Sequence, residues 1–178
     1  MLSFPDLGAL PSLDGFHCTQ LTEQDADHML ELQADMLAAL PHPTWYYPSS
    51  RAAFAACCLR GEVFGFWQDS RLAGFGILTP WHARPDTCYA VKLQHPPQNT
   101  FDFQDVMVSP QFRRRGIHST LLTFFERLAR AGGGVAMYCT IAPDNTPSVS
   151  NFTKAGFVCI RQQPAYEGML RGYYRKLL

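Results

Sequence analysis

The segment from Val106 to Ser119 constrains the fold more than any other part of the sequence. Its first residues, Val106 to Val108, are apolar and stop shortly before Pro110, which is typical of a buried strand. A basic run, Arg113 to Arg115, leads to Gly116 and directly into an amphipathic stretch. Exposed N–H groups and the positive end of a helix make such a turn suitable for an anion, phosphate above all. The pattern predicts a strand, a glycine-containing turn and a helix whose N-terminus binds phosphate.

Composition limits the classes of protein to which the chain can belong. It has 178 residues, no net charge, 47% apolar and 17% charged residues, which is typical of one globular domain spanning 1–178. The neutral balance disfavours a nucleic-acid or membrane partner, and no apolar run approaches the roughly 20 residues of a spanning helix. The six cysteines form no C-x-x-C pair and no Cys/His cluster with zinc spacing. We therefore expect a cytoplasmic protein without a metal site.

Apolar periodicity, with glycine and proline as breaks, predicts the order of the elements. Strands are expected over residues 16–21, 62–68, 71–78, 101–108, 135–142, 157–162 and 170–178. Helices are expected over residues 22–40, 51–60, 117–131 and 146–155. Residues 79–100 are predicted to form a long loop with a short strand over Cys88–Leu93. This order predicts an α/β (α+β) fold with a single mixed sheet.

Two motifs, in this order, resemble those of the GNAT superfamily of N-acetyltransferases. The first is the acetyl-CoA motif of that family, Arg/Gln-x-x-Gly-x-Gly/Ala, which Arg113 to His118 match in part. The second is an Asn…Tyr-x-x-x-Gly-Phe pattern, which Asn145 to Phe157 resemble. The resemblance runs over residues 101–157 and extends loosely over the whole chain. It implies a mostly antiparallel sheet of six or seven strands flanked by about four helices, with acetyl-CoA as co-substrate.

The resemblance also implies a role for each matching position. Main-chain groups of Val106, Met107 and Val108 would pair with the pantetheine arm of the cofactor, and Asn145 would bind the arm near its reacting end. Main-chain N–H groups of the turn would hold the pyrophosphate; these are in Arg113, Arg114, Arg115, Gly116, Ile117, His118 and Ser119. Taken alone, an arginine run is also typical of a solvated turn, and Asn145 of a turn before a helix.

Two positions depart from the family pattern. His118 stands where the motif has Gly or Ala, so its side chain narrows the approach to the turn unless it points away. Phe152 stands where many members have a tyrosine whose phenol protonates the departing CoA sulfur, and a phenylalanine cannot donate that proton. Ser148 is a candidate substitute or water anchor. Phe152 also keeps open an alternative function, a non-catalytic acyl-CoA-binding sensor or interaction domain.

Transfer to an amine needs a neutral amine and therefore a base or a water path. Two acids lie on the strand before the turn. Asp102 matches the place of the catalytic glutamate in the histone acetyltransferase branch, and Asp105 lies nearer the turn. Regular alternation puts these two acids on opposite faces of the strand, so at most one of them faces the cleft unless a bulge intervenes. Both are also typical of acids on the surface of a strand.

An aromatic, nearly neutral segment follows the first predicted helix. It contains His42, Trp45, Tyr46 and Tyr47, in a region where members of the superfamily often shape the acceptor site. The same residues are equally typical of a hydrophobic lid or interface. We predict an acetyl-CoA-dependent N-acetyltransferase that moves an acetyl group to a primary amine of a small molecule or peptide by direct attack. A phosphate-binding protein unrelated to CoA is a further alternative, and the sequence leaves a homodimer open.

Overall fold

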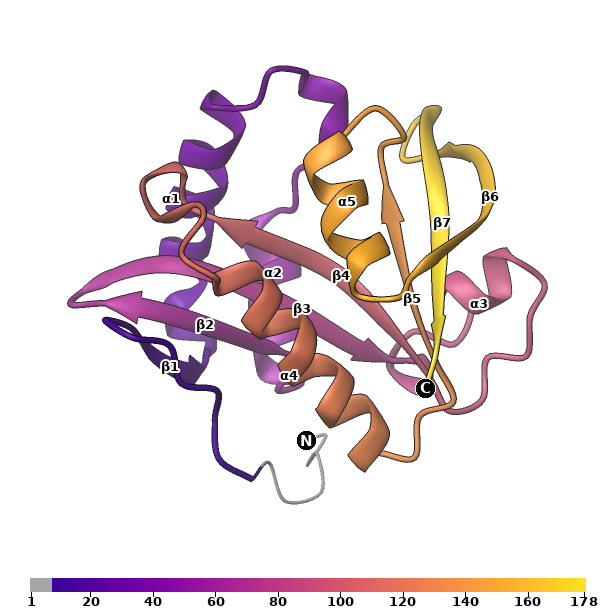
Figure 1. The fold of residues 1–178 in the computed structure, drawn as a ribbon, viewed down its shortest axis with the longest axis horizontal. Helices are drawn as coiled ribbons and strands as arrows, with labels where there is room; N and C mark the ends of the chain where they lie inside the picture. Colours follow the sequence, from indigo (N-terminus) through magenta and orange to yellow (C-terminus); the bar gives the residue numbers. More distant parts are fainter. Residues whose placement is uncertain (1–7) are drawn as a thin grey trace.

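In residues 8–178, which the computed structural model describes, seven strands form one sheet with helices on both faces (Figure 1). The sheet order is β1-β2-β3-β4-β5-β7-β6, and neighbours are antiparallel except for β4 and β5. The strands are β1 (His17–Gln20), β2 (Val63–Gln68), β3 (Arg71–Pro80), β4 (Thr100–Val108), β5 (Ala136–Ile141), β6 (Val158–Ala165) and β7 (Met169–Leu177). The helices are α1 (Ala26–Ala38), α2 (Arg51–Leu59), α3 (Tyr89–Lys92), α4 (Ile117–Ala131) and α5 (Thr146–Lys154), with 3-10 turns η1 (Glu23–Asp25), η2 (Pro43–Trp45), η3 (Trp81–Ala83) and η4 (Pro110–Phe112). The predicted mixed, mostly antiparallel sheet is confirmed.

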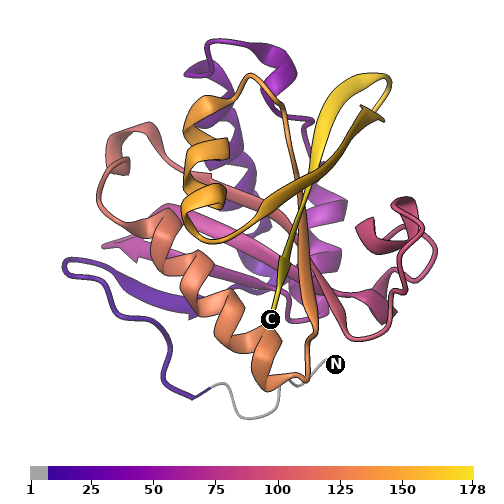
Figure 2. The same ribbon diagram turned by 45° about the vertical axis from the view of Figure 1, so that its right-hand side comes forward.

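Each face of the sheet is covered by its own pair of helices (Figures 1 and 2). α4 and α5 lie on one face, where Leu121, Phe125 and Phe152 join one apolar cluster. α1 and α2 lie on the other face, where Met29 and Phe54 join a second cluster. Leu121 and Phe125 are fully buried, and burial of a side chain of this size contributes about 1.5–3 kcal/mol. The predicted amphipathic stripe therefore fixes α4 on the sheet directly after the basic turn.

β4 and β5 separate soon after they begin. The two strands pair only at three positions, from Thr100 opposite Ala136 to Asp102 opposite Tyr138. Beyond this point β4 stays paired with β3, and β5 stays paired with β7. Figure 1 shows β4 and β5 diverging from a common end. The facing edges of the two strands are therefore open, and an open edge offers main-chain N–H and C=O groups to an extended ligand.

A bulge in β4 changes which side chains face each helix layer. Two residues of β4, Gln104 and Asp105, together lie opposite one residue of β3, because the register shifts between Phe103 and Val106. Phe103 and Val106 both contact the cluster beneath α4 and α5. Asp102 and Asp105 neighbour these two residues, so both acids face the opposite side of the sheet. The regular alternation expected along this strand is broken here, as an extra residue in one strand requires.

The segment predicted as a short strand over Cys88–Leu93 is instead a helical turn, α3. The prediction was wrong because the cap of this turn comes from another element. The carboxylate of Asp102 in β4 accepts hydrogen bonds from the Tyr89 main-chain N–H at 3.0 and 3.2 Å. An anionic acceptor at the first turn stabilises a helix, and a cap supplied by a distant strand leaves no local signal in the sequence.

Candidate functional site

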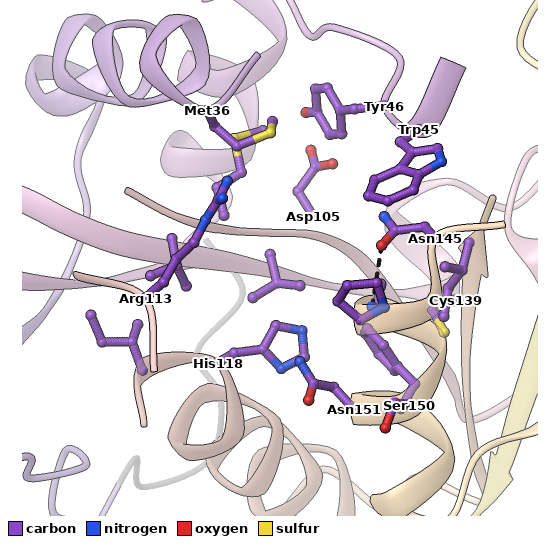
Figure 3. A pocket seen from close by; sticks show the side chains of 18 of the residues that line it. Met36, Trp45, Tyr46, Asp105, Arg113, His118, Cys139, Asn145, Ser150 and Asn151 are labelled. Carbon is purple, nitrogen blue, oxygen red and sulfur yellow. Dashed lines mark hydrogen bonds between the residues drawn. The ribbon is translucent and has the colours of Figure 1, made fainter. Parts of the chain in front are cut away.

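A large cavity lies where β4 and β5 separate (Figure 3). Its volume is about 660 Å³. The start of α4 and the helix α5 line one side, and the end of α1 with the η2 segment lines the other. The predicted site residues that line it are Asp105, Val106, Met107, Val108, Arg113, Arg114, Gly116, Ile117, His118, Ser119, Asn145 and Ser148. Asp102 and Arg115 are not among the lining residues.

The N-terminus of α4 forms the end of the cavity where phosphate binding was predicted. Gly116 caps the helix with φ +89°, a left-handed conformation that favours glycine. The first bond of the helix runs from the Thr120 N–H to the Gly116 carbonyl, so the amides of residues 117–119 have no acceptor within α4. Arg113 and Arg114 line the same end. Free amides, a helix dipole and two guanidinium groups together suit an anionic group.

Arg115 leaves the cavity although it belongs to the same basic run. Its guanidinium lies over the ring of Phe16 at 4.8 Å from the centroid. Its neighbour Arg114 has φ +61°, so the backbone changes direction between these two arginines. A cation over an aromatic face is held by the ring's quadrupole. Arg115 therefore anchors the turn to the segment before β1, while Arg113 and Arg114 remain at the cavity.

The main chain of β4 presents polar groups to the gap beside β5. The Ser109 N–H donates to the Ala73 carbonyl of β3 at 2.9 Å. Alternate residues of an antiparallel strand bond to the same neighbour, so the main-chain groups of Val106 and Val108 turn away from β3 and toward the gap. β5 does not pair with them, because its ladder with β4 ends at Asp102. These groups are available to a ligand that lies along the gap.

α5 supplies the polar groups of a second wall. Asn145 is the N-cap of α5, and its side-chain oxygen accepts a hydrogen bond from the Ser148 N–H at 3.2 Å. This cap uses only the oxygen, so the amide NH2 group of Asn145 stays available as a donor. Phe152, one turn beyond Ser148, is 3% exposed, and its ring lies edge-on to that of Phe103 with the centroids 5.3 Å apart. Phe152 is part of the core and offers no proton to the cavity.

Asp105 lies in the cavity wall next to Tyr46 (Figure 3). Desolvation raises the pKa of Asp105 to about 6, although the Tyr46 hydroxyl and the positive charge of Arg84 oppose this rise. Burial raises the pKa of Tyr46 far above its usual range, and the negative charge of Asp105 adds to this rise. At neutral pH the carboxyl group is therefore ionised but more basic than an exposed aspartate. Such a group suits proton acceptance from an amine.

Asp102 lies on the same strand but in a different environment. It is 2% exposed, and both of its oxygens accept from the first amide of α3. Burial raises its pKa to about 7, while the Tyr89 amide and the charges of Arg84 and Lys92 lower it. Through these hydrogen bonds the carboxyl group caps α3, and Asp102 is not among the residues that line the cavity. Of the two acids considered from the sequence, Asp105 is the one that the bulge brings to the cavity.

The aromatic segment after α1 divides into two parts. Trp45 and Tyr46 line the cavity, whereas His42 and Tyr47 are not among the lining residues. Tyr47 instead donates a hydrogen bond to Glu167 at 3.0 Å and stacks on Tyr166, with the ring centroids 5.5 Å apart. These contacts tie the segment to the turn between β6 and β7. The wall formed by Trp45 and Tyr46 is thereby held against the rest of the cavity.

Several lining residues had no signal in the sequence. Gln104 is brought there by the bulge, and its side-chain oxygen accepts from the Arg84 guanidinium at 2.6 Å. Cys139 and Thr140 come from β5, and Met36 comes from the end of α1. No local motif marks these positions, because each depends on how far two strands separate or how a distant helix ends. The buried thiol of Cys139 has its pKa raised well above the usual value by desolvation.

The residues present fit a phosphate-bearing ligand with a polar arm. The free amides of α4 suit the phosphates, and the open edge of β4 suits an extended arm. Among residues 8–178, no group of three or more His, Cys, Asp or Glu side chains could hold a metal ion. Over the same residues, no helix is long and apolar enough to cross a bilayer.

Comparison with solved structures gives the same fold. An N-acetyltransferase from Staphylococcus aureus is 19% identical with a TM-score of 0.69, over 91% of this chain and 98% of that one. The yncA protein of Salmonella typhimurium, solved with its cofactor acetyl-CoA, is 16% identical with a TM-score of 0.68, over 93% and 95%. The paia N-acetyltransferase of Thermoplasma acidophilum, solved in complex with coenzyme A, is 15% identical with a TM-score of 0.67, over 92% and 99%. At these identities the likeness shows the fold alone.

Two comparisons of the sequence gave different results. Comparison with curated protein sequences gave no significant match. The model of the acetyltransferase (GNAT) family matches residues 26–157, which is more than half of the chain. The matched range contains both motifs and every lining residue discussed above. The chain therefore belongs to the GNAT family of acetyltransferases.

Proposed function

We propose that this protein transfers the acetyl group of acetyl-CoA to a primary amine of a small molecule or peptide. The single observation that carries the proposal is the joining of two different ends in one cavity. One end has the free amides of α4 with Arg113 and Arg114, and the other end has Asp105 beside an aromatic wall. A site for an anionic donor thus opens directly onto a site for a basic acceptor.

The donor would be held along the opening between β4 and β5. The α4 amides and Gly116 would bind the pyrophosphate, and the main chain of Val106 and Val108 would pair with the pantetheine arm. When bound, acetyl-CoA supplies a thioester carbonyl as the site of attack. A main-chain N–H of β4 in the gap would stabilise the negative charge that develops on the carbonyl oxygen. Holding both reactants in one cavity lowers the barrier further by proximity.

Asp105 is the proposed general base. An amine arrives at neutral pH mostly as an ammonium ion and must lose a proton before it attacks. The pKa of Asp105, raised to about 6, leaves the carboxylate ionised at pH 7 and able to take that proton. Asp105 lines the cavity, whereas Asp102 caps α3. This difference in placement supports Asp105 over Asp102.

Direct attack by the amine is supported by the protonation state of Cys139, the cysteine that lines the cavity. Desolvation raises the pKa of Cys139 well above its usual value, so the nucleophilic thiolate is disfavoured. Phe152 cannot protonate the departing CoA sulfur. We assign that proton to a water held by Ser148, which lines the same cavity.

The acceptor end favours an amine on an apolar body. Met36, Leu40, Trp45 and Tyr46 line it, and Asp105 is the acidic side chain among the residues that line the cavity. A single carboxylate suits one ammonium group, whereas a polycationic acceptor would leave other charges against apolar surface. We therefore expect monoamines with an aromatic or aliphatic body, including peptide amines next to an apolar side chain, to be preferred.

The test is release of free CoA thiol from acetyl-CoA over a panel of amines, with acetylated product identified by mass. Turnover should be detected with apolar monoamines and be weaker with polyamines. Acetyl-CoA should also raise the free energy of unfolding, by about 2.7 kcal/mol at 100 times its Kd. Absence of both stabilisation and turnover would refute the proposal.

A non-catalytic acyl-CoA-binding domain is the second candidate, and Phe152 is the observation that favours it. Phe152 is 3% exposed and lies where many members of the family have a tyrosine acid. This candidate predicts stabilisation by acetyl-CoA without turnover of any amine in the panel. The same two measurements therefore separate the two functions.

A further inference from the structure

The turn between β6 and β7, residues 166–168, lies at the same end of the molecule as the segment after α1 (Figures 1 and 2). All three of its residues have a positive φ, +43° at Tyr166, +62° at Glu167 and +92° at Gly168. Glycine adopts this conformation freely, whereas the other two residues are strained in it. Such strain persists only where the surrounding contacts enforce it. The shape of this turn is therefore imposed by contacts with other parts of the chain.

Tyr166 makes such contacts with both ends of its side chain. Its hydroxyl oxygen lies at hydrogen-bond distance from the Thr140 Oγ1 atom, at 3.0 Å, and from the Tyr89 hydroxyl, at 2.8 Å. Its ring stacks on that of Tyr47, with the centroids 5.5 Å apart and an interplanar angle of 16°. Desolvation raises the pKa of Tyr166, and the negative charge of Asp105 adds to this rise, so the hydroxyl stays protonated at neutral pH. The side chain thus joins β5, α3 and the segment after α1.

Tyr166 connects two parts of the cavity wall, although it is not itself among the lining residues. One of its partners, Thr140 of β5, lines the cavity. Its other partner, Tyr47, directly follows Tyr46, which lines the cavity next to Asp105. The separation between the wall formed by Trp45 and Tyr46 and the wall formed by β5 therefore depends on the Tyr166 side chain.

The partners of Tyr166 are themselves held in place. Tyr89 is buried, and its main-chain N–H donates to the Asp102 carboxylate of β4. Tyr47 is tied a second time to the same turn, because its hydroxyl donates to the Glu167 carboxylate at 3.0 Å. These contacts fix Tyr166 between the sheet and the segment after α1. They also give a role to α3, which presents the hydroxyl of Tyr89 to Tyr166.

We propose that Tyr166 is a positioning residue for the amine acceptor, because it holds the wall formed by Trp45 and Tyr46 at a fixed distance from Thr140. This inference rests on the proposed function, since it requires an amine bound in the cavity beside Asp105. Tyr166 acts through its neighbours and does not touch the substrate. The turn that leads into α4 makes none of these contacts, so a change at Tyr166 affects the acceptor and spares CoA.

The experiment measures steady-state kinetics with the apolar monoamine of the panel that is turned over fastest, starting with 2-phenylethylamine, and binding of CoA by calorimetry. Tyr166→Phe removes the hydroxyl and keeps the stacked ring. The KM for the amine should rise about three- to tenfold, the usual contribution of one hydrogen bond. Both kcat and the Kd of CoA should stay within twofold, which is the pattern expected when only acceptor binding is weakened. Tyr166→Leu also removes the stacking and should raise the KM further.

A double-mutant cycle tests whether Tyr166 acts through Tyr47. Tyr47→Leu removes the same stacking contact as Tyr166→Leu and should also raise the KM for the amine. The double variant should therefore raise the KM by less than the product of the two single effects, because the shared contact can be lost only once. A double variant that shows the full product would overturn the inference, since the two residues would then act independently.

Tyr138→Phe is the matched control for the loss of a buried tyrosine hydroxyl. Tyr138 lies on β5 but is not among the lining residues, and its hydroxyl lies 3.0 Å from the Nδ1 atom of His95. This variant should lose stability in thermal melts, as Tyr166→Phe does, and leave the KM for the amine unchanged. If Tyr166→Leu fails to fold, Tyr166→Phe and this control carry the test.

Three further results bear on the inference. An unchanged KM for the amine in Tyr166→Phe and Tyr47→Leu would overturn it, because the wall would then not depend on this side chain. An equal rise of KM in Tyr138→Phe, or an equal loss of CoA affinity in Tyr166→Phe, would overturn it by showing a general loosening of the fold. Absence of turnover by the wild type with every amine would remove the proposed function itself, a result distinct from the others because it needs no substitution.

Discussion

The phosphate end of the cavity comes from one stretch of chain, whereas the acceptor end is assembled from several. Residues 106–119 supply the strand, the basic turn and the start of α4 in direct succession. Tyr46 from the segment after η2, Met36 from α1 and Asp105 from the bulge meet only in the folded protein. In the proposed function, the contiguous unit would bind a group common to many reactions, while the assembled wall would select the acceptor. Substitutions that affect one end of the cavity and leave the other unchanged test this division of roles between the two ends.

The largest effect is expected at the acceptor end, with Asp105→Asn. Loss of the general base should lower kcat/KM by roughly 100-fold or more. In the wild type, kcat/KM should rise with pH through about 6, because the base works only when ionised and its pKa is raised to about 6. Steady-state rates from pH 5 to 8 measure both effects, and the affinity for CoA should stay within twofold. A variant with normal kcat/KM would exclude Asp105 as the base.

The next effect is expected at the phosphate end, with Gly116→Val. A branched side chain is strained at φ +89°, so the turn should lose its shape and CoA affinity should fall roughly tenfold or more. Gly133→Val is the matched control at the other end of α4, because it has φ +73° with open space around it. Both variants should lose stability in thermal melts. Equal CoA affinity in the two would argue against phosphate binding at this turn.

A third prediction separates the two acids of β4 through stability. The pKa of Asp102 in the folded protein is raised to about 7, above the value of about 3.9 in an unfolded chain. Ionisation therefore costs stability, and this cost grows as the pH rises from 4 to 7. Asp102→Asn removes the charge and keeps the acceptor oxygen for α3. At pH 8 it should raise the free energy of unfolding by about 1–3 kcal/mol.

The readout for Asp102→Asn is denaturant unfolding at pH 8 and at pH 4, with a smaller gain at pH 4. Catalysis should change less than twofold, in contrast to Asp105→Asn. Stabilisation together with a large loss of kcat would indicate that Asp102, and not Asp105, is the general base. Destabilisation at pH 8 would show that the carboxylate charge is needed by the cap.

The smallest effect is expected where the two ends meet, with Phe152→Tyr. The added phenol could donate the proton that the departing sulfur requires, so kcat should rise about two- to tenfold. Phe152→Leu, which stays apolar, is the control and should not show this gain. Saturation kinetics measure kcat for both variants. A lower kcat in the tyrosine variant would indicate that water already delivers this proton along a path that the hydroxyl blocks.

Local patterns were sufficient for most of the fold. Alternation and helical periodicity gave the strands and the four longer helices, because each of these elements buries its own apolar side chains. They failed at Cys88–Leu93, where the cap that makes α3 helical comes from Asp102 in β4. The local patterns also predicted a β4 without a bulge. The structure has a bulge there, because a bulge depends on the register with β3 rather than on the sequence of one strand.

The sequence by itself determined the strand, the turn and the amphipathic helix at the proposed phosphate end, since these elements are adjacent in the chain and their geometry is local. Only the tertiary structure decided which acid faces the cavity, which aromatic residues line it, and that Arg115 turns away from it. These outcomes depend on where β4 and β5 separate, on one extra residue in β4, and on contacts with Phe16 and the turn between β6 and β7. Such relations join residues far apart in the chain, and no short pattern encodes them.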